Sequence, residues 1–216
     1  AAYFGSIPKG TIAINRPTIK EPALGGEVRD IIYDNIQLPG VFQAYRAPKQ
    51  GGNEYYAFNV LSTILSGGES SRMNKTLVDK KQQAAAAQSV PFFNEDEGLL
   101  IALAIANVGV KIETLEQSMD SVTDQLKNEL VSEREFQKVK NQITSDLVSS
   151  KATMAGIAES LANNEVYFGD ANLINTELEK YNKVTREDVL NVAKKYLNKD
   201  NRVVLYYLPK QKSASK

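Results

Sequence analysis

The 216-residue sequence contains no cysteine and no histidine. Without cysteine the chain forms no disulfide, offers no thiolate nucleophile and cannot hold zinc through sulfur. Without histidine it has no Ser-His-Asp triad, no HExxH-type zinc site and no imidazole general base. A metal would have to bind through carboxylates and carbonyls alone, which suits Ca²⁺ or Mg²⁺ better than zinc. These two absences exclude much ordinary hydrolytic chemistry from this chain by itself.

A net charge and long apolar runs are also missing. Lys+Arg and Asp+Glu number 26 each, so no net field favours nucleic acid or an anionic membrane. No apolar run approaches the roughly 18 residues of a membrane-spanning helix. The opening stretch, AAYFGSIPKG, lacks the basic region and apolar core of a signal peptide. What is present is a hydrophobic content of 42%, which is ordinary for a globular domain with a real core.

The two ends of the chain differ in composition from its middle. Residues 5–26 are rich in proline and glycine and show little periodicity, which predicts an extended linker. We therefore expect residues 1–26 to be an interdomain linker with the tail of a preceding domain. Residues 27–209 form one domain in this interpretation, and the lysine-rich residues 210–216 a disordered tail.

The first half of the domain alternates between strand and helix patterns. Alternating, β-branched residues predict strands at 27–36 and 41–47, arranged as a hairpin or near neighbours. Asn53 predicts the cap of a helix that Gly67-Gly68 terminate. A second helix over 71–81, capped by Ser70 or Ser71, should follow. Two further strands are predicted at 87–93 and 99–108, the former an edge strand or bulged because it contains Pro91.

The second half is mainly helical. Helices are predicted from 112 to about 131, over 151–168 and over 173–181. Two more helices are predicted to begin at capping boxes, one at Ser132–Glu135 and one at Thr185–Asp188. A strand at 201–209 closes the domain. Strands joined by turns rather than by crossovers imply an antiparallel sheet with helices packed on one face. The predicted fold class is α+β.

A family resemblance rests on three stretches: YFGSIPKG (3–10), LSTILSGGESSRMNKTLVDKK (61–81) and NKVTREDVLNVAKKYLNKDNRVVLYYLP (182–209). In this order and spacing they resemble the M16 (insulinase/pitrilysin) metallopeptidase family, and specifically its C-terminal inactive domain. The first is similar to the end of the family's first domain and its linker. The second is similar to its helix, glycine turn and following helix, and the third to its closing helix and strand. The resemblance covers nearly the whole chain.

The resemblance also implies that the catalytic residues of the family lie outside this chain. The family's zinc is held by an HxxEH motif and a downstream glutamate in a different domain. Zinc would therefore lie upstream of this chain or on a partner chain. Many members also supply an Arg and a Tyr, seven residues apart, that reach the substrate carbonyl from this kind of domain. Val78 occupies the Arg position and Ala85 the Tyr position, so both polar groups are lost; Arg72 is no replacement, because Asp79 lies seven residues on.

Two functions follow from the resemblance. The chain is the non-catalytic second domain of an M16-type zinc metallopeptidase and walls the chamber that encloses unfolded peptides, or it is a non-catalytic M16-like scaffold or activating subunit. The implied partners are unfolded peptides and an upstream catalytic domain or M16 partner subunit, in a homo- or heterodimer. Nucleic acid and a membrane span are not expected. The compartment is left open and is compatible with the periplasm of a bacterium. A third interpretation is a free-standing binding module.

Three segments are candidate contacts with a substrate or partner. The turn residues Gly67, Gly68, Ser71 and Arg72 are candidates for contacting substrate or the other half of the enzyme. The alternatives are a plain helix–helix turn or an anion-binding helix N-terminus, although the Lys-Ser/Thr ending of a P-loop is missing. The strand at 87–93 offers an edge for an extended peptide unless another segment covers it. The acidic segment Asn94–Glu97 forms either a solvated turn or a loop that loosely resembles a cation-binding loop.

Overall fold

The computed structural model describes residues 3, 5–8, 10–13 and 21–210. Within this part of the chain, five strands form one sheet in the order β1-β5-β2-β4-β3. The strands are β1 (Val28–Asp34), β2 (Gly40–Ala47), β3 (Ala84–Phe92), β4 (Gly98–Ala106) and β5 (Arg202–Pro209). Much of the predicted linker and of the C-terminal tail lies outside the described residues, so the domain boundaries stay predictions.

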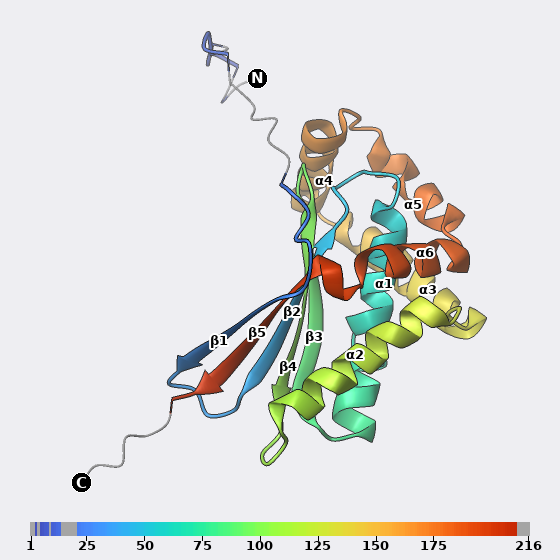
Figure 1. Ribbon diagram of the computed structural model, residues 1–216. Helices are drawn as coiled ribbons and strands as arrows, with labels where there is room; N and C mark the ends of the chain where they lie inside the picture. The colour runs from blue at the N-terminus through green and yellow to red at the C-terminus, as the bar shows by residue number, and fades with distance from the viewer. Residues whose placement is uncertain (1–2, 4, 9, 14–20, 211–216) are drawn as a thin grey trace.

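The helices lie together on one side of this sheet (Figure 1). They are α1 (Tyr55–Ser66), α2 (Ile112–Asn128), α3 (Glu133–Ser150), α4 (Met154–Phe168), α5 (Leu173–Lys183) and α6 (Arg186–Tyr196), with a π-helix η1 (Asn74–Lys80) and a 3₁₀ turn η2 (Lys199–Asn201). The α+β class with helices on one face is confirmed. Nowhere in the described ranges is a helix both long and apolar enough to cross a membrane.

The core fills the space between these helices and the inner sheet face. Strand residues alternate in direction, so Val41 and Tyr45 of β2 point toward the helices and are almost fully buried. From α1, Tyr56, Val60 and Ile64 at helical spacing are buried as well; α1 packs on β3, α3 and α6, whereas α2 and α6 cover β2. Apolar residues at helical spacing thus meet apolar residues at strand spacing, which is the contact that fixes the layers.

The strand order corrects two expectations. β5 lies between β1 and β2, so the predicted hairpin is wrong, and β1 runs parallel to β5, which makes the sheet mixed rather than wholly antiparallel. The burial of the strands gives the reason. Arg202 and Val204 of β5 are buried and need neighbours on both sides, whereas β1 contains no buried residue and loses least at the edge.

Several local expectations also change. α1 begins after Glu54 without a side-chain cap, so Asn53 is not its cap, and the Glu54 carboxylate accepts a hydrogen bond from Tyr196 instead. β3 begins at Ala84, three residues before the predicted strand. The capping box at Thr185–Asp188 is confirmed, with both reciprocal hydrogen bonds present. Of the tyrosine pair in β5, Tyr206 bonds to α2 and Tyr207 to β1, on opposite faces as the strand period requires.

A buried charged cluster fastens β1 and β5 to α2. Arg202 is 2% exposed; it donates to Asp120 Oδ1 at 2.5 Å and to Glu27 Oε2 at 2.5 Å. Its neighbour Arg29 pairs with Glu27 and Glu116. Burial disfavours the ionised form of Asp120, but the hydrogen bonds and charge of Arg202 outweigh this effect and lower the pKa of Asp120. Asp120 is therefore ionised at neutral pH and paired with Arg202.

Among the described residues, removal of Arg202 should leave Asp120 with Lys199 as its only cation, at 3.8 Å, and Glu116 with the partly exposed Arg29 alone. We expect Arg202→Met to lower the free energy of unfolding by about 3–5 kcal/mol, because a partly buried charge loses its partner. The control is Arg29→Met, whose side chain is 44% exposed; it should cost about 1 kcal/mol. Urea denaturation followed by circular dichroism measures both changes, and equal losses would contradict the burial argument.

Candidate functional site

The predicted glycine turn connects α1 to η1, and its two glycines are required for different reasons. A Cβ on Gly67 would lie 2.5 Å from the carbonyl oxygen and 2.5 Å from the Cγ2 atom of Thr63. Gly68 has open space around it but a φ of +95°, which side-chain-bearing residues rarely adopt. Gly67 therefore permits the backbone of the turn to pass close to Thr63 of α1, and Gly68 permits the chain to change direction after the helix.

Arg72, the charged member of the predicted site, is held by α3. Its Nε and Nη2 atoms donate to the two carboxylate oxygens of Glu135 at 3.1 and 2.8 Å. The Ser132 hydroxyl accepts a hydrogen bond from the Glu135 N–H, but the Glu135 carboxylate binds Arg72 and not the Ser132 N–H, so only half of the predicted capping box forms. A guanidinium engaged in this bidentate way has little capacity left for an anion or a substrate carbonyl.

The serines of the turn are likewise occupied or buried. Ser71 is 2% exposed and its hydroxyl has no hydrogen-bond partner within the described residues. Ser70 Oγ accepts a hydrogen bond from Lys138 Nζ of α3 at 2.8 Å. The prediction that one of these hydroxyls caps the next helix is therefore wrong. Together with Arg72–Glu135, the Lys138 contact ties the turn firmly to α3.

The segment after the turn is a π-helix rather than the α-helix predicted over 71–81. Such wide turns are rare and are often found at functional sites. Leu77 anchors η1 in the core, and Val78 packs partly buried beside it. Ala85 is exposed in β3. Neither Val78 nor Ala85 carries a polar side-chain atom, so this element presents no side-chain donor at those positions.

β3 is confirmed as an edge strand. It pairs with β4 on one side and stands last in the strand order of the described sheet. Its alanine run departs from the strand period: Ala84 is buried, whereas Ala85 and Ala86 are both exposed at a register shift between Ala84 and Ala86. Val90 is 38% and Phe92 50% exposed toward the outer face. The strand therefore combines an unpaired backbone edge with accessible apolar side chains, and no charged residue protects it.

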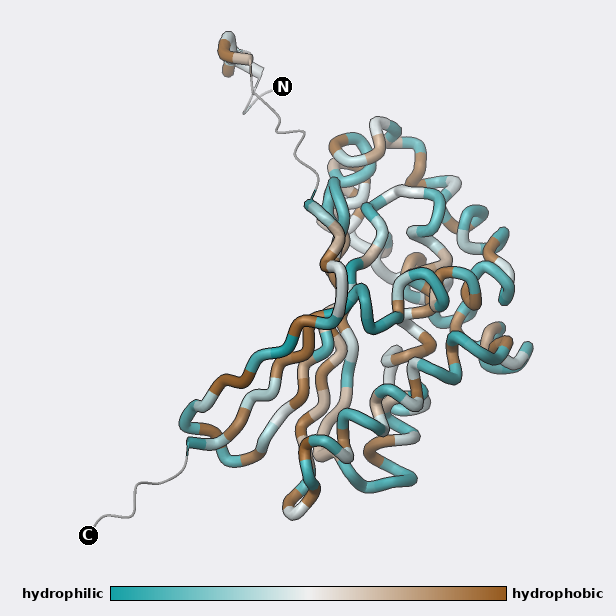
Figure 2. The backbone as a smooth tube through the Cα atoms, in the orientation of Figure 1, coloured by the Kyte–Doolittle hydropathy of each residue, from teal (hydrophilic) through white to brown (hydrophobic). Residues whose placement is uncertain are grey.

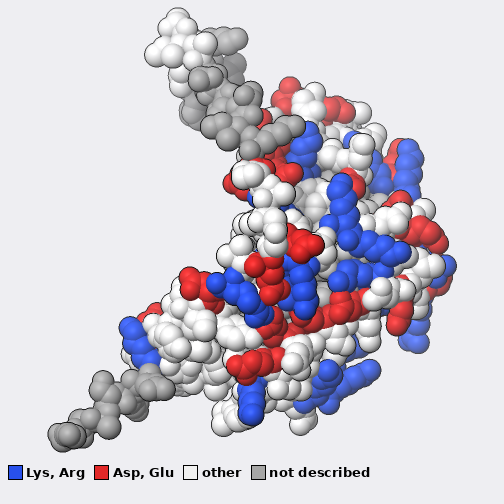
Figure 3. All heavy atoms as spheres, in the orientation of Figure 1, with Lys and Arg blue, Asp and Glu red and all other residues white. Residues whose placement is uncertain are grey.

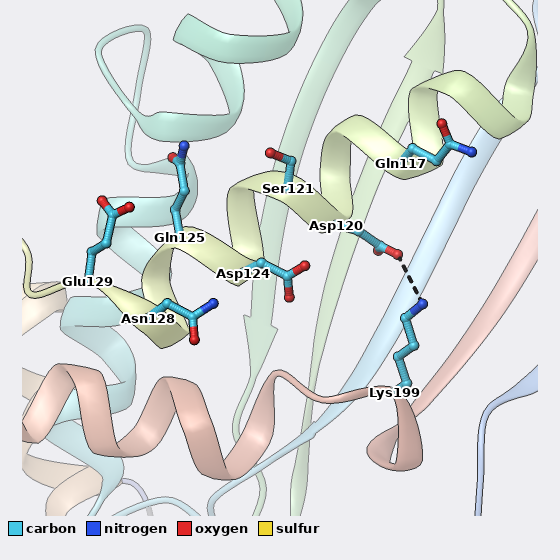
Figure 4. Close-up of a pocket in the computed structure, with 8 residues that line it drawn as sticks. All are labelled: Gln117, Asp120, Ser121, Asp124, Gln125, Asn128, Glu129 and Lys199. Atoms are coloured by element: carbon cyan, nitrogen blue, oxygen red, sulfur yellow. Dashed lines mark ion pairs between the residues drawn. The ribbon is translucent and has the colours of Figure 1, made fainter.

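A polar depression that sequence patterns did not predict lies along α2 (Figure 4). Asp120 and Asp124 project toward the side of α2 that faces η2, and Lys199 of η2 reaches Asp120 at 3.8 Å. Two of its three acids are already paired, Asp120 with Arg202 and Asp124 with Lys127. Charges of both signs are intermixed over the helical side of the molecule (Figure 3). Across the described ranges, no three Cys, His, Asp or Glu side chains are grouped to hold a metal ion.

Comparison with known proteins identifies the family. Residues 1–143 match the family model described as the Peptidase M16 inactive domain. A curated relative, the Zinc protease PqqE of Helicobacter pylori, is 30% identical over 159 residues, which are 71% of this chain and 36% of the relative. The chain therefore belongs to the M16 peptidase family and corresponds to its inactive domain, and the resemblance found in the sequence is confirmed.

Solved structures share the same fold. A protease from Helicobacter pylori matches with a TM-score of 0.85 at 24% identity, over 93% of this chain and 49% of that one. A peptidase M16 inactive domain from Pseudomonas fluorescens matches with a TM-score of 0.79 at 17% identity, over 96% and 49%. The chain thus spans about half the length of these solved chains. The substrate and half-contact roles of Gly67, Gly68, Ser71 and Arg72 stay predictions.

The two glycines of the turn should respond differently to alanine. We expect Gly68→Ala to cost about 1 kcal/mol of unfolding free energy through backbone strain alone. Gly67→Ala should cost more, about 3 kcal/mol, because the new methyl group meets a backbone carbonyl that cannot move aside. Gly109→Ala is the control for strain, since Gly109 has a φ of +80° and open surroundings. Thermal and urea unfolding provide the values, and a Gly67 cost no larger than that of Gly109 would count against the close approach.

Proposed function

We propose that this chain is the non-catalytic second domain of an M16-type zinc metallopeptidase and that it walls a chamber around peptide substrates. The zinc and its HxxEH motif belong, in this proposal, to a preceding domain or a partner subunit. The observation that carries the proposal is an intact M16 inactive-domain fold in a sequence without histidine or cysteine. The name of the relative, a zinc protease, supports zinc chemistry elsewhere in the parent protein.

The proposed peptide-facing element is the edge strand β3, which η1 connects to the turn from Gly67 to Arg72. η1 joins the two: the Gln83 N–H donates to the Leu77 carbonyl at 2.8 Å, which fixes the beginning of β3 against η1. An extended peptide can add to an edge strand through main-chain hydrogen bonds. Such recognition depends on flexibility rather than on a side-chain code, which suits a chamber that selects unfolded chains.

The alternative is a scaffold or activating subunit without a zinc domain of its own. The apolar residues at Val78 and Ala85 are compatible with it, because they remove the side chains that many members direct at the substrate. The two functions differ in the full-length polypeptide. The first requires HxxEH and a later glutamate upstream; the second requires a separate zinc-bearing subunit that co-purifies.

The catalytic part of the proposal is tested by peptide hydrolysis. The purified chain should not cleave a flexible fluorogenic peptide with added zinc, because no side chain here can hold a hydrolytic zinc ion. The full-length polypeptide should cleave it, and chelation should abolish that activity. Hydrolysis by the chain alone contradicts the proposal. A full-length polypeptide that lacks HxxEH and co-purifies with a zinc-bearing subunit favours the alternative.

The peptide-facing role of β3 is tested by hydrogen exchange on the chain itself. A saturating unfolded peptide should slow amide exchange across β3, because new main-chain hydrogen bonds form at its free edge. The matched control is β1, the other edge strand, whose Ile31 N–H is already bonded to the Asp30 carboxylate at 2.8 Å. Equal protection of both edges, or of neither, contradicts the assignment of β3.

A further inference from the structure

The segment that leads into β1 is held on the domain mainly by polar contacts. Residues 21–27 read EPALGGE, and Leu24 is their only large aliphatic side chain. Apolar residues predominate along β4, by contrast, and the hydropathy of the chain shows this difference (Figure 2). Partial burial of one leucine offsets little of the conformational entropy that is lost when the whole segment is ordered. Other contacts must therefore fix its position.

Arg46, at the end of β2, binds the beginning of this segment. Its Nη2 atom donates a hydrogen bond to the Pro22 carbonyl at 2.5 Å and lies 3.6 Å from the Glu21 carboxylate. Its Nη1 atom reaches the carboxylate of Glu97, directly before β4, at 3.5 Å. The Arg46 side chain is only 18% exposed, so solvent screens these contacts less than it would on an open surface. One guanidinium thus joins the segment to the turn between β3 and β4.

Glu27 anchors the other end of the segment independently. Its carboxylate accepts a hydrogen bond from the buried Arg202 at 2.5 Å and another from Arg29 at 2.8 Å. Gly25 and Gly26 lie between the two anchors, with φ angles of +72° and +152° and no atom within 4 Å of the place where a Cβ would stand. Two glycines in open space can change their backbone angles at little steric cost. The segment therefore has two fixed points with a pivot between them.

We propose that Arg46 is a clamp that fixes the direction in which the chain enters this domain, and that Gly25-Gly26 is the hinge about which the segment moves when the clamp opens. The closed clamp holds residues 21–24 beside the turn between β3 and β4 (Figure 1). When it opens, the segment pivots while Glu27 stays bound to Arg202, so β1 keeps its place in the sheet. This conformational device does not depend on the proposed peptidase role.

Backbone ¹⁵N relaxation of the purified chain tests the clamp. The wild-type order parameters at Ala23 and Leu24 should be close to the rigid value of about 0.85, and Arg46→Met should lower them below about 0.6. Methionine keeps the apolar stem of the side chain and removes every hydrogen-bond donor. The order parameters of β1 should stay unchanged in this variant, because the second anchor of the segment is intact.

Two further variants accompany this measurement. Arg186→Met is the matched control, because Arg186 of α6 also binds a backbone carbonyl, that of Val131, and a carboxylate, that of Glu133, each at 3.3 Å. It should leave the order of residues 21–24 unchanged. Arg46→Lys keeps the charge but lacks the planar fork that reaches the carbonyl and both carboxylates, so it should give an intermediate order parameter.

Three results would overturn the clamp. One is a wild-type chain whose order parameters at Ala23 and Leu24 are already below about 0.6. The second is an Arg46→Met chain as rigid at these amides as the wild type, and the third is an equal loss of order in the Arg186→Met control. Loss of order that continues through β1 would overturn the hinge, because the motion would then not stop at Gly25-Gly26.

Discussion

A β-sheet has two faces, and an apolar face exposed to water is costly. This constraint governs the domain. The helices of the described chain gather on the inner face, where α2 and α6 cover the buried Val41 and Tyr45 of β2 and α1 packs on β3. The outer face is also largely apolar, yet the described part of the domain supplies no helix to cover it. The described domain thus has a complete core on one side of the sheet and exposed apolar side chains on the other.

The charged cluster holds the edge of the sheet that hydrophobic burial does not hold. β1 has no buried side chain, so hydrophobic burial alone holds it weakly. Arg202 compensates by linking β5 to α2 through Asp120 and to the beginning of β1 through Glu27. The cost of burying these charges is offset because each finds several partners, including the hydroxyl of Tyr45. A polar network at the margin of the core therefore fixes the strand order that makes the sheet mixed.

Sequence patterns predict what is local and miss what depends on distant pairing. The apolar spacing predicts α1, the two glycines predict where it ends, and Pro91 predicts an edge strand at β3. Each signal depends only on nearby residues, and the structure confirms these elements. The insertion of β5 between β1 and β2 depends on contacts between residues more than 150 positions apart. No local signal marks Glu135 as the partner of Arg72 either, so the sequence favours a capping box there. The π-helical winding of η1 likewise has no simple sequence signature.

The family assignment gives these observations their functional meaning. This M16 inactive domain carries Val78 in η1 and Ala85 in β3, and neither side chain has a polar group. The most direct test is the metal content of the purified chain after incubation with zinc and desalting, measured by native mass spectrometry. The account predicts no retained stoichiometric zinc. One tightly bound zinc ion per chain would contradict it, because carboxylates alone would then have formed a zinc site that the described part of the fold gives no sign of.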